Sequence, residues 1–240
     1  MGYRKLIKGF NKFKEDYFQT DKKEFYQKLV KEGQNPDTLV IACSDSRIDP
    51  AILTDSIPGD FFAVRNVAAL VPPYAKDASL HGTSSAIEYA VRALQVKHII
   101  VLGHAECGGM CALATDTYKA KSGNEFDFIE NWLDIASDAK EMIDDMFKDI
   151  SPHEKATLLE KAGIIVSMEN LLTFPWIKAR YDAGDIKLHG WYFDMKRGAL
   201  LEYSSQKGEF ANISSHVSEG VKVDYREQLK NYLETYKGAL

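Results

Sequence analysis

Two short segments contain the side chains of this sequence that could do chemistry. Residues 43–47 read Cys-Ser-Asp-Ser-Arg, and residues 104–109 read His-Ala-Glu-Cys-Gly-Gly. Cysteine thiolates and histidine imidazoles are ligands of zinc, and a site with three protein ligands leaves the fourth position open for chemistry. The two segments therefore predict a catalytic zinc centre formed by Cys43, His104 and Cys107.

Each segment follows a run of aliphatic residues that is typical of a buried strand. Residues 39–41 are Leu-Val-Ile, and residues 99–102 are Ile-Ile-Val-Leu. In open parallel sheets, ligand sites form at the carboxyl ends of the strands. We therefore expect the two strands to end side by side and to bring the three ligands together.

Asp45 and Arg47 follow Cys43 at alternate positions. If the chain stays extended, alternate side chains point to the same side, so all three could lie together. A carboxylate that pairs with a guanidinium stays ionised and oriented, and it can accept a hydrogen bond from water on the metal. We predict that Asp45 and Arg47 are catalytic residues.

Other interpretations of the cysteines remain open. A buried cysteine is often only a small hydrophobic residue, and a His-x-x-Cys pair alone is weak evidence for a metal. The two segments together, with the Asp–Arg pair attached, favour metal binding. Cys111, four residues after Cys107, is expected to be a packed thiol. If it is instead a fourth ligand, the chain is a structural zinc or redox-thiol protein without turnover.

Composition limits the classes of partner. The net charge is −5, no long basic run occurs, and the apolar runs are too short for a membrane span, so we expect neither nucleic acid nor membrane as a partner. The first residues lack the apolar stretch of a secretory signal. Three cysteines in 240 residues are too few for a disulfide framework, so we expect a cytoplasmic protein.

From residue 38 onward, apolar runs alternate with helical patterns. This pattern predicts an α/β fold with a central, mostly parallel β-sheet flanked by helices. Strands are expected at residues 38–42, 61–67, 98–103, 163–168 and 187–194, with an antiparallel edge strand at 199–203. Helices are expected at residues 79–95, 107–115, 126–147, 152–162, 171–183 and 225–236.

We expect residues 1–240 to form a single domain with three parts. Residues 1–33 have apolar side chains at helical spacing, which predicts an N-terminal helical arm that packs on a partner subunit or on its own domain. Residues 34–205 are expected to form the zinc-binding α/β core. Residues 206–240 are expected to form a C-terminal helical extension.

The sequence resembles the β-class carbonic anhydrases, which are zinc enzymes, from about residue 33 to residue 203. The resemblance implies the reversible hydration of carbon dioxide to bicarbonate and a proton, a role in carbon utilization, and one Zn²⁺ per subunit on Cys43, His104 and Cys107. Besides the two ligand segments, it rests on residues 58–62, 64–66, 86–91, 169–171, 173–175 and 188–191.

The resemblance also implies roles for residues around the metal. Asp45 and Arg47 would form the dyad that orients a zinc-bound hydroxide for attack on carbon dioxide. The substrate-binding residues would be Gln34, which donates a hydrogen bond to a substrate oxygen, together with Phe62, Tyr89 and Gly108, which line or border the pocket.

One position separates the subtypes of this family. Members with an inhibitory bicarbonate site have a tryptophan where this chain has Val40. We therefore expect the open-site type, with Asp45 held by Arg47, and a structural role for Arg65. Glu106, where many relatives have a small residue, has no interpretation from the sequence, and neither has the proton shuttle.

The resemblance implies a homodimer or a higher homo-oligomer. The N-terminal helices would lie across the partner, and the active site would lie at the dimer interface. The nearest alternative is a hydrolase on the same scaffold that acts on carbonyl sulfide or carbon disulfide. It would use the same ligands, and access to the pocket would separate the two.

Overall fold

The computed structural model of the chain describes residues 2–20, 22–77, 79–119, 126–213 and 225–238. It divides into two compact units, Met1–Pro36 and Asp37–Leu240, and each is described by itself. In the described part of the chain, no helix is both long and apolar enough to cross a membrane.

The N-terminal unit is a pair of helices, α1 (Gly2–Phe18) and α2 (Lys22–Glu32). Their contact is aromatic, because Tyr26 of α2 meets the rings of Phe13 and Tyr17 of α1 at centroid distances of 5.7 and 5.5 Å. Within the described residues, neither helix buries a side chain. Helices are therefore present where apolar side chains recur at helical spacing, and in α1 the side chains of Leu6 and Phe10 are exposed.

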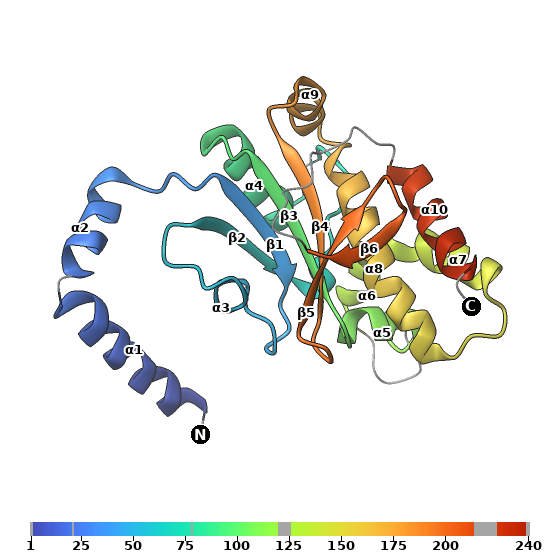
Figure 1. Cartoon of the computed structure of the whole chain (residues 1–240), viewed down its shortest axis with the longest axis horizontal. Coiled ribbons are helices and arrows are strands. Elements are labelled where there is room, and N and C mark those ends of the chain that lie inside the picture. Colours follow the sequence, from blue (N-terminus) through green and yellow to red (C-terminus); the bar gives the residue numbers. More distant parts are fainter. Residues whose placement is uncertain (1, 21, 78, 120–125, 214–224, 239–240) are drawn as a thin grey trace. The chain divides into compact units, whose positions relative to one another are not determined.

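The second unit is built on a sheet of six strands, counted within the described residues, in the order β2-β1-β3-β4-β5-β6 (Figure 1). The strands β2, β1, β3 and β4 are parallel to one another, whereas β5 and β6 are added as antiparallel edge strands. The predicted fold class is confirmed. The strands are β1 (Thr38–Cys43), β2 (Phe61–Asn66), β3 (His98–His104), β4 (Lys187–Asp194), β5 (Ala199–Ser204) and β6 (Glu209–Asn212).

Helix α8 is the central helix of this unit. This helix, at residues 152–171, packs on β3 and β4, and the helices at residues 108–115, 137–146 and 225–238 pack around it (Figure 1). The helices are α3 (Pro50–Leu53), α4 (Gly82–Glu88), α5 (Gly108–Thr115), α6 (Ile129–Leu133), α7 (Ser137–Met146), α8 (Pro152–Leu171), α9 (Pro175–Ala183) and α10 (Tyr225–Gly238).

The central strands are buried on both faces, which explains their uninterrupted aliphatic sequences. In β1, Leu39 and Ile41 belong to the main core, whereas Val40 and Ala42 belong to a second, smaller core. Strand β3 alternates in the same way. Burial on both faces fixes the register, because a shift by one residue would exchange the two sets of side chains. The carboxyl ends of β1 and β3 are therefore well-defined positions for functional residues.

One predicted strand, at residues 163–168, is wrong. These residues lie inside α8, which continues the predicted helix at 152–162. Between residues 158 and 168, every residue except Lys161 is buried. A helix that is covered all round loses the apolar–polar period, so the β-branched run at 164–166 has the composition of a strand.

Other predicted boundaries differ in detail. The expected helical extension at 206–240 also contains β6, a short strand that pairs with β5. Residues 214–224 of that extension lie outside the described residues. Three predicted helices are shorter or interrupted: 79–95 by a π turn at Tyr89–Ala93, 126–147 by a 3-10 turn at Asp134–Ala136, and 171–183 by the turn before Pro175.

Candidate metal centre

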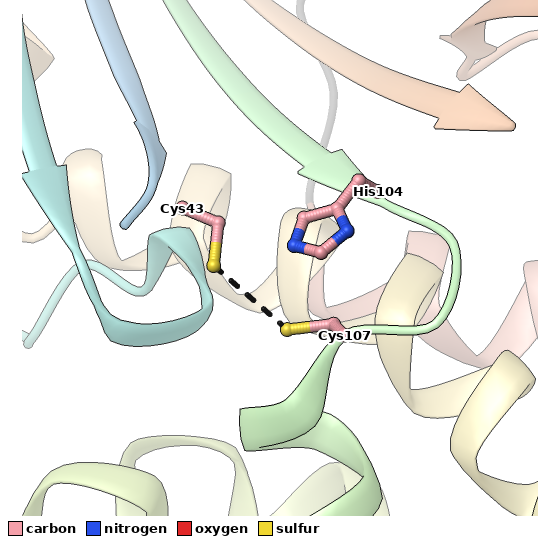
Figure 2. A group of neighbouring side chains, drawn as sticks. All are labelled: Cys43, His104 and Cys107. Carbon is pink, nitrogen blue, oxygen red and sulfur yellow. Dashed lines mark hydrogen bonds between the residues drawn. The ribbon is translucent and has the colours of Figure 1, made fainter. Parts of the chain in front are cut away.

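The three side chains predicted to bind zinc lie together at one edge of the sheet (Figure 2). Cys43 ends β1, His104 ends β3, and Cys107 precedes the first turn of α5. Their potential ligand atoms all lie within 4.8 Å of one another, and the two sulfur atoms are 4.0 Å apart. All three residues are buried. We call this group the Cys-His-Cys cluster.

Strand register and one unusual backbone conformation bring the cluster together. Strands β1 and β3 are adjacent and parallel, with Ala42 opposite Leu102, so they end at the same edge of the sheet. Between His104 and Cys107 the chain turns through Glu106, whose φ of 58° is uncommon for a residue other than glycine. This turn brings Cys107 back toward His104.

His104 is oriented by a hydrogen bond on the outer side of its ring. Its Nδ1 donates to the carbonyl oxygen of Ala105 at 2.8 Å, so that in the neutral ring Nε2 keeps its lone pair. Nε2 is buried and has no hydrogen-bond partner within the described part of the chain. A buried polar atom without a partner is costly, so Nε2 fits a metal ion that would take its lone pair.

The two thiols point to a cation as well. The hydrogen bond between them lowers the pKa of Cys43 to about 4 and raises the pKa of Cys107, because a second thiolate beside the first would be repelled in a buried site. A divalent cation between the sulfur atoms would hold both as thiolates. Two sulfur donors and one imidazole are a ligand set of zinc, so the residues present fit this metal.

Asp45 and Arg47 form a two-pronged ion pair beside the cluster. Arg47 Nε donates to Asp45 Oδ1 at 2.9 Å, and Arg47 Nη2 donates to Oδ2 at 2.6 Å. The guanidinium holds the pKa of Asp45 well below its usual range, so the carboxylate stays ionised. Asp45 Oδ2 lies 3.9 Å from His104 Nε2. The ionised carboxylate is therefore next to the unpartnered nitrogen of the cluster.

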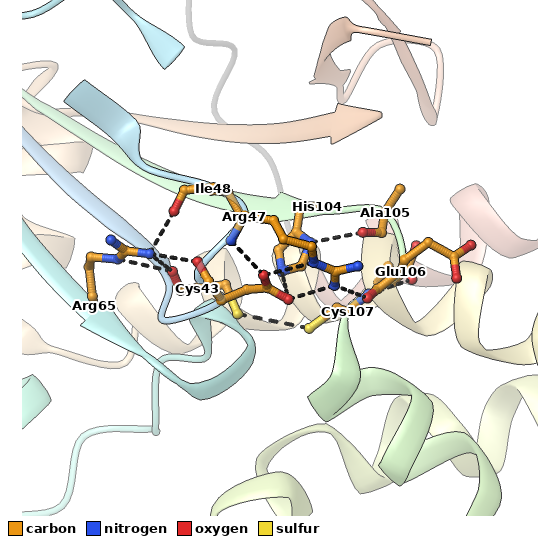
Figure 3. A network of polar contacts seen from close by, with 10 residues as sticks. Cys43, Arg47, Ile48, Arg65, His104, Ala105, Glu106 and Cys107 are labelled. Carbon is orange, nitrogen blue, oxygen red and sulfur yellow. Dashed lines mark hydrogen bonds and ion pairs between the residues drawn. The ribbon is translucent and has the colours of Figure 1, made fainter. Parts of the chain in front are cut away.

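The backbone of this pair is not extended, contrary to our expectation, but turns at residues 46–47. The amide of Arg47 donates to Asp45 Oδ1 at 2.9 Å within this turn. Arg47 Nη2 also donates to the carbonyl oxygen of Glu106 at 2.8 Å (Figure 3). Arg47 thus joins the loop that follows β1 to the loop that follows β3.

A buried acid that the sequence analysis missed contacts the cluster from α8. Glu160 accepts hydrogen bonds from the Cys107 amide at 3.1 Å and from the Tyr192 hydroxyl at 2.7 Å. It is only 6% exposed, and burial raises its pKa. Lys161 follows it directly in the sequence, so the residue types alone did not mark Glu160 as buried.

Helix α5 begins at the cluster, and the second of its two glycines is closely packed. A Cβ at Gly109 would lie 3.0 Å from Val67 and 3.1 Å from Ala68, whereas a Cβ at Gly108 would meet nothing within 4 Å. Cys111 is exposed, and it is not part of the donor cluster found among the described residues. This arrangement favours a site with three protein ligands over a closed one.

The aromatic residues predicted for the substrate pocket lie near the start of β2, whereas the Cys-His-Cys cluster lies at the carboxyl end of the neighbouring strand β1. Phe62 and Tyr89 contact each other, with ring centroids 5.8 Å apart. Phe62 lies opposite Leu39 in the sheet. Four residues of extended strand, about 13 Å, separate Leu39 from Cys43, so Phe62 lies about that far along the sheet from the cluster. Tyr89 is 49% exposed, and Gln34 is exposed in the N-terminal unit.

The fold and the cluster define an α/β protein with a Cys-His-Cys metal-binding site at the carboxyl edge of a mostly parallel sheet. Residues 38–200 match the carbonic anhydrase family. A carbonic anhydrase of Synechocystis sp. is 34% identical, over 90% of this chain and 76% of its own. The solved structure of the β-carbonic anhydrase CcaA has a TM-score of 0.82 at 31% identity, over 94% of this chain and 96% of its own. The chain belongs to the carbonic anhydrase family of enzymes, in its β class.

A further solved relative comes from a study of two tetrameric β-carbonic anhydrases of Sordaria macrospora. It has a TM-score of 0.70 at 26% identity, over 83% of this chain and 95% of its own. The similarity extends over most of both chains, so the two proteins share their architecture.

Proposed function

We propose that this protein catalyses the reversible hydration of carbon dioxide to bicarbonate and a proton, with zinc as cofactor. The observation that carries this proposal is the Cys-His-Cys cluster with the ionised Asp45 held beside it by Arg47. Membership of the carbonic anhydrase family supports the same reaction. A structural zinc site would require a fourth protein donor, and the cluster in the described part of the chain has three.

Zinc would be held by Cys43 Sγ, His104 Nε2 and Cys107 Sγ. When bound, zinc lowers the pKa of a water ligand to about 7 and so supplies a strong nucleophile at neutral pH. The protein keeps the three donors buried and fixed at the ends of two strands and the start of a helix. Burial excludes competing ligands and bulk water from the donors.

Asp45 is suited to direct the nucleophile. Its Oδ1 receives the amide and the Nε of Arg47, and its Oδ2 receives Nη2. A lone pair of Oδ2 therefore remains for a proton of the nucleophile. Because Arg47 keeps the carboxylate ionised, Asp45 accepts this hydrogen bond and leaves the lone pair of the nucleophile directed at carbon dioxide.

We also propose the open-site type, in which Asp45 stays on Arg47. Val40, in place of the tryptophan of the inhibitory bicarbonate site, is buried in the second core. The Nε, Nη1 and Nη2 groups of Arg65 all donate to protein acceptors. These contacts support a structural role for Arg65 rather than a role in anion binding.

Stopped-flow measurement of carbon dioxide hydration tests both proposals. We expect activity that rises between about pH 7 and pH 9, disappears when a chelator removes zinc, and returns when zinc is restored. Absence of zinc-dependent hydration would contradict the proposed reaction. Turnover of carbonyl sulfide or carbon disulfide in preference to carbon dioxide would favour the alternative hydrolase. Cooperative inhibition by bicarbonate would contradict the open-site type.

We infer that a second copy of the chain completes each site. Tyr89 and Phe62 contact each other near the start of β2, away from the cluster of their own chain. We infer that they line the substrate pocket of a second copy. In α1, Leu6 and Phe10 are 73% and 61% exposed. Residues 1–36 have nine basic and five acidic side chains, so they contribute +4 to the net charge of −5 and leave −9 for residues 37–240. An apolar, basic segment at residues 1–36 is complementary to the acidic residues 37–240 of another copy.

Sedimentation equilibrium tests this assembly. The parent chain should be a dimer or a higher oligomer, and replacing both Leu6 and Phe10 by aspartate should shift it toward monomer, because the apolar face of α1 is removed. Asn11→Asp is the matched control, because it adds a charge to the exposed surface of the same helix without removing an apolar side chain. A monomeric parent chain would contradict the proposal.

A further inference from the structure

Arg65, on β2, directs its guanidinium into the loop that follows Cys43 (Figure 3). Its Nε and Nη2 both donate to the carbonyl oxygen of Cys43 at 3.1 Å. Nη2 also donates to the carbonyl oxygens of Asp45 at 2.8 Å and Ile48 at 2.6 Å. Nη1 donates to Asp49 Oδ2 at 3.1 Å. A single side chain therefore holds this loop at four residues.

This loop lies between two regular elements. The sheet contacts of β1 end where the amide of Ser44 donates to the carbonyl oxygen of Asn66 at 2.8 Å. Helix α3 begins at Pro50, with Asp49 as its N-cap. The carbonyl oxygen of Asp45 lies in the irregular segment between them, where it also accepts the amide of Ile48 at 3.3 Å. The position of the Asp45 backbone thus depends on contacts inside the loop and on Arg65.

We propose that Arg65 is a positioning residue that keeps the Asp45 carboxylate on Arg47 and away from the metal. Arginine suits this role, because its planar guanidinium is always charged and presents five donors in a fixed fork. A lysine would present one compact ammonium group and could not reach the same carbonyl oxygens together. The inference rests on the proposed function only in giving Asp45 a catalytic role. The contacts of Arg65 are features of the fold.

The geometry explains what Arg65 prevents. Asp45 Oδ2 is 3.9 Å from His104 Nε2, so a small shift of the loop would bring this oxygen within reach of a metal on the cluster. A carboxylate is a good zinc ligand and would then occupy the open position. Cys43 depends less on Arg65, because its strand pairs with both β2 and β3. Loss of Arg65 should therefore displace Asp45 while the metal stays bound.

Arg65→Lys tests the proposal, with Arg180→Lys as its matched control. Arg180 also donates to backbone carbonyl oxygens, those of Val91 at 3.0 Å and Asp185 at 3.4 Å, but it lies on α9. We expect Arg65→Lys to bind zinc in the same amount as the parent and to lose about 100-fold in kcat, the order of effect of a displaced catalytic group. Its cobalt-substituted form should change its visible spectrum, because a carboxylate oxygen joins the ligands. Arg180→Lys should keep the parent kcat and spectrum.

Adding Asp45→Asn to Arg65→Lys identifies the cause of the spectral change. If Asp45 moves onto the metal, the double variant should return to the parent spectrum, because an amide is a poor ligand for this ion. A parent-like spectrum and kcat in Arg65→Lys would overturn the proposal. Loss of metal from Arg65→Lys would also overturn it, because Arg65 would then serve ligand retention rather than the position of Asp45.

A second variant and the cobalt spectrum test the role of Arg65 even if Arg65→Lys does not fold or the parent chain is inactive. If Arg65→Lys does not fold, Asp49→Asn removes the charged partner of Arg65 and keeps an N-cap acceptor for α3. It should produce a smaller spectral change of the same kind, and an unchanged spectrum would overturn the proposal. The cobalt spectrum does not depend on turnover. A parent chain without hydration activity would therefore contradict the proposed function and leave the test of Arg65 intact.

Discussion

Asp45→Asn should keep its zinc and lose about 10²- to 10⁴-fold in kcat for carbon dioxide hydration, the range expected for a residue that handles the reacting proton. Asparagine has the same size, but its amide has one acceptor oxygen and no charge. The two-pronged pair with Arg47 would be lost, and an N–H donor could face the nucleophile. Zinc should remain, because Asp45 is not one of the three donors of the cluster.

Stopped-flow kinetics and metal analysis on the same preparation check this prediction. Asp194→Asn is a matched control, since Asp194 Oδ1 also accepts the amide of Arg197, at 3.2 Å, and its Oδ2 lies 3.7 Å from Arg197 Nε. This control should leave kcat close to that of the parent. An Asp45→Asn variant with the parent kcat would show that Asp45 does not direct the reaction.

The pH profile separates Asp45 from other titrating groups. Arg47 lowers the pKa of Asp45, so this carboxylate is already ionised throughout the neutral range. A group with a depressed pKa loses its charge only when the pH falls through that lowered value. A decrease in rate between about pH 8 and pH 6 therefore comes from a group other than Asp45.

The second large effect is expected from Cys107→Ser, which should lose zinc and, with it, the hydration activity. A serine hydroxyl does not ionise at neutral pH and cannot replace a thiolate ligand. Removing a residue that only hydrogen-bonds to a metal ligand typically weakens metal binding about 10- to 100-fold. Removing a ligand itself should weaken zinc binding by more than that. Competition with a chromophoric chelator measures the change in affinity.

Cys111→Ser is the control for this experiment, because Cys111 is exposed and outside the cluster. It should bind zinc and turn over carbon dioxide as the parent does. In the cobalt-substituted proteins, the thiolate charge-transfer absorbance should be equal in the parent and Cys111→Ser. An absorbance that drops in Cys111→Ser would mean that Cys111 is a ligand, and the site would then be closed rather than catalytic.

The sequence was sufficient to predict the parts of this molecule that follow from strand ends. Burial on both faces makes β1 and β3 recognisable as aliphatic runs, and the residues that follow such runs in a parallel sheet meet at one edge. The positions of Cys43 and His104 follow from this rule. The ion pair of Asp45 with Arg47 was also predicted, although a turn rather than an extended chain brings these side chains together.

Contacts that use the backbone were not predictable from residue types. Arg65 is held by carbonyl oxygens, and every residue has one, so nothing in the sequence identifies its partners. Glu160 could not be placed because α8 is buried all round and has no amphipathic period. The place of Phe62 and Tyr89 in a substrate pocket depends, in our proposal, on a second copy of the chain. The family resemblance implied a site at a dimer interface, whereas the residue pattern of the chain itself does not show which side chains a second copy would use.

The bond from Arg47 to position 106 has a consequence for how this site can evolve. Arg47 contacts the carbonyl oxygen of Glu106, whereas the Glu106 side chain pairs with Lys196 at 2.5 Å and lies 3.7 Å from His153. The centre is thus constrained at this position by a peptide group and not by a side chain. The hydrogen bond from Arg47 can therefore survive substitution of Glu106, provided that the new residue accepts a φ of 58°, which excludes proline and disfavours β-branched residues.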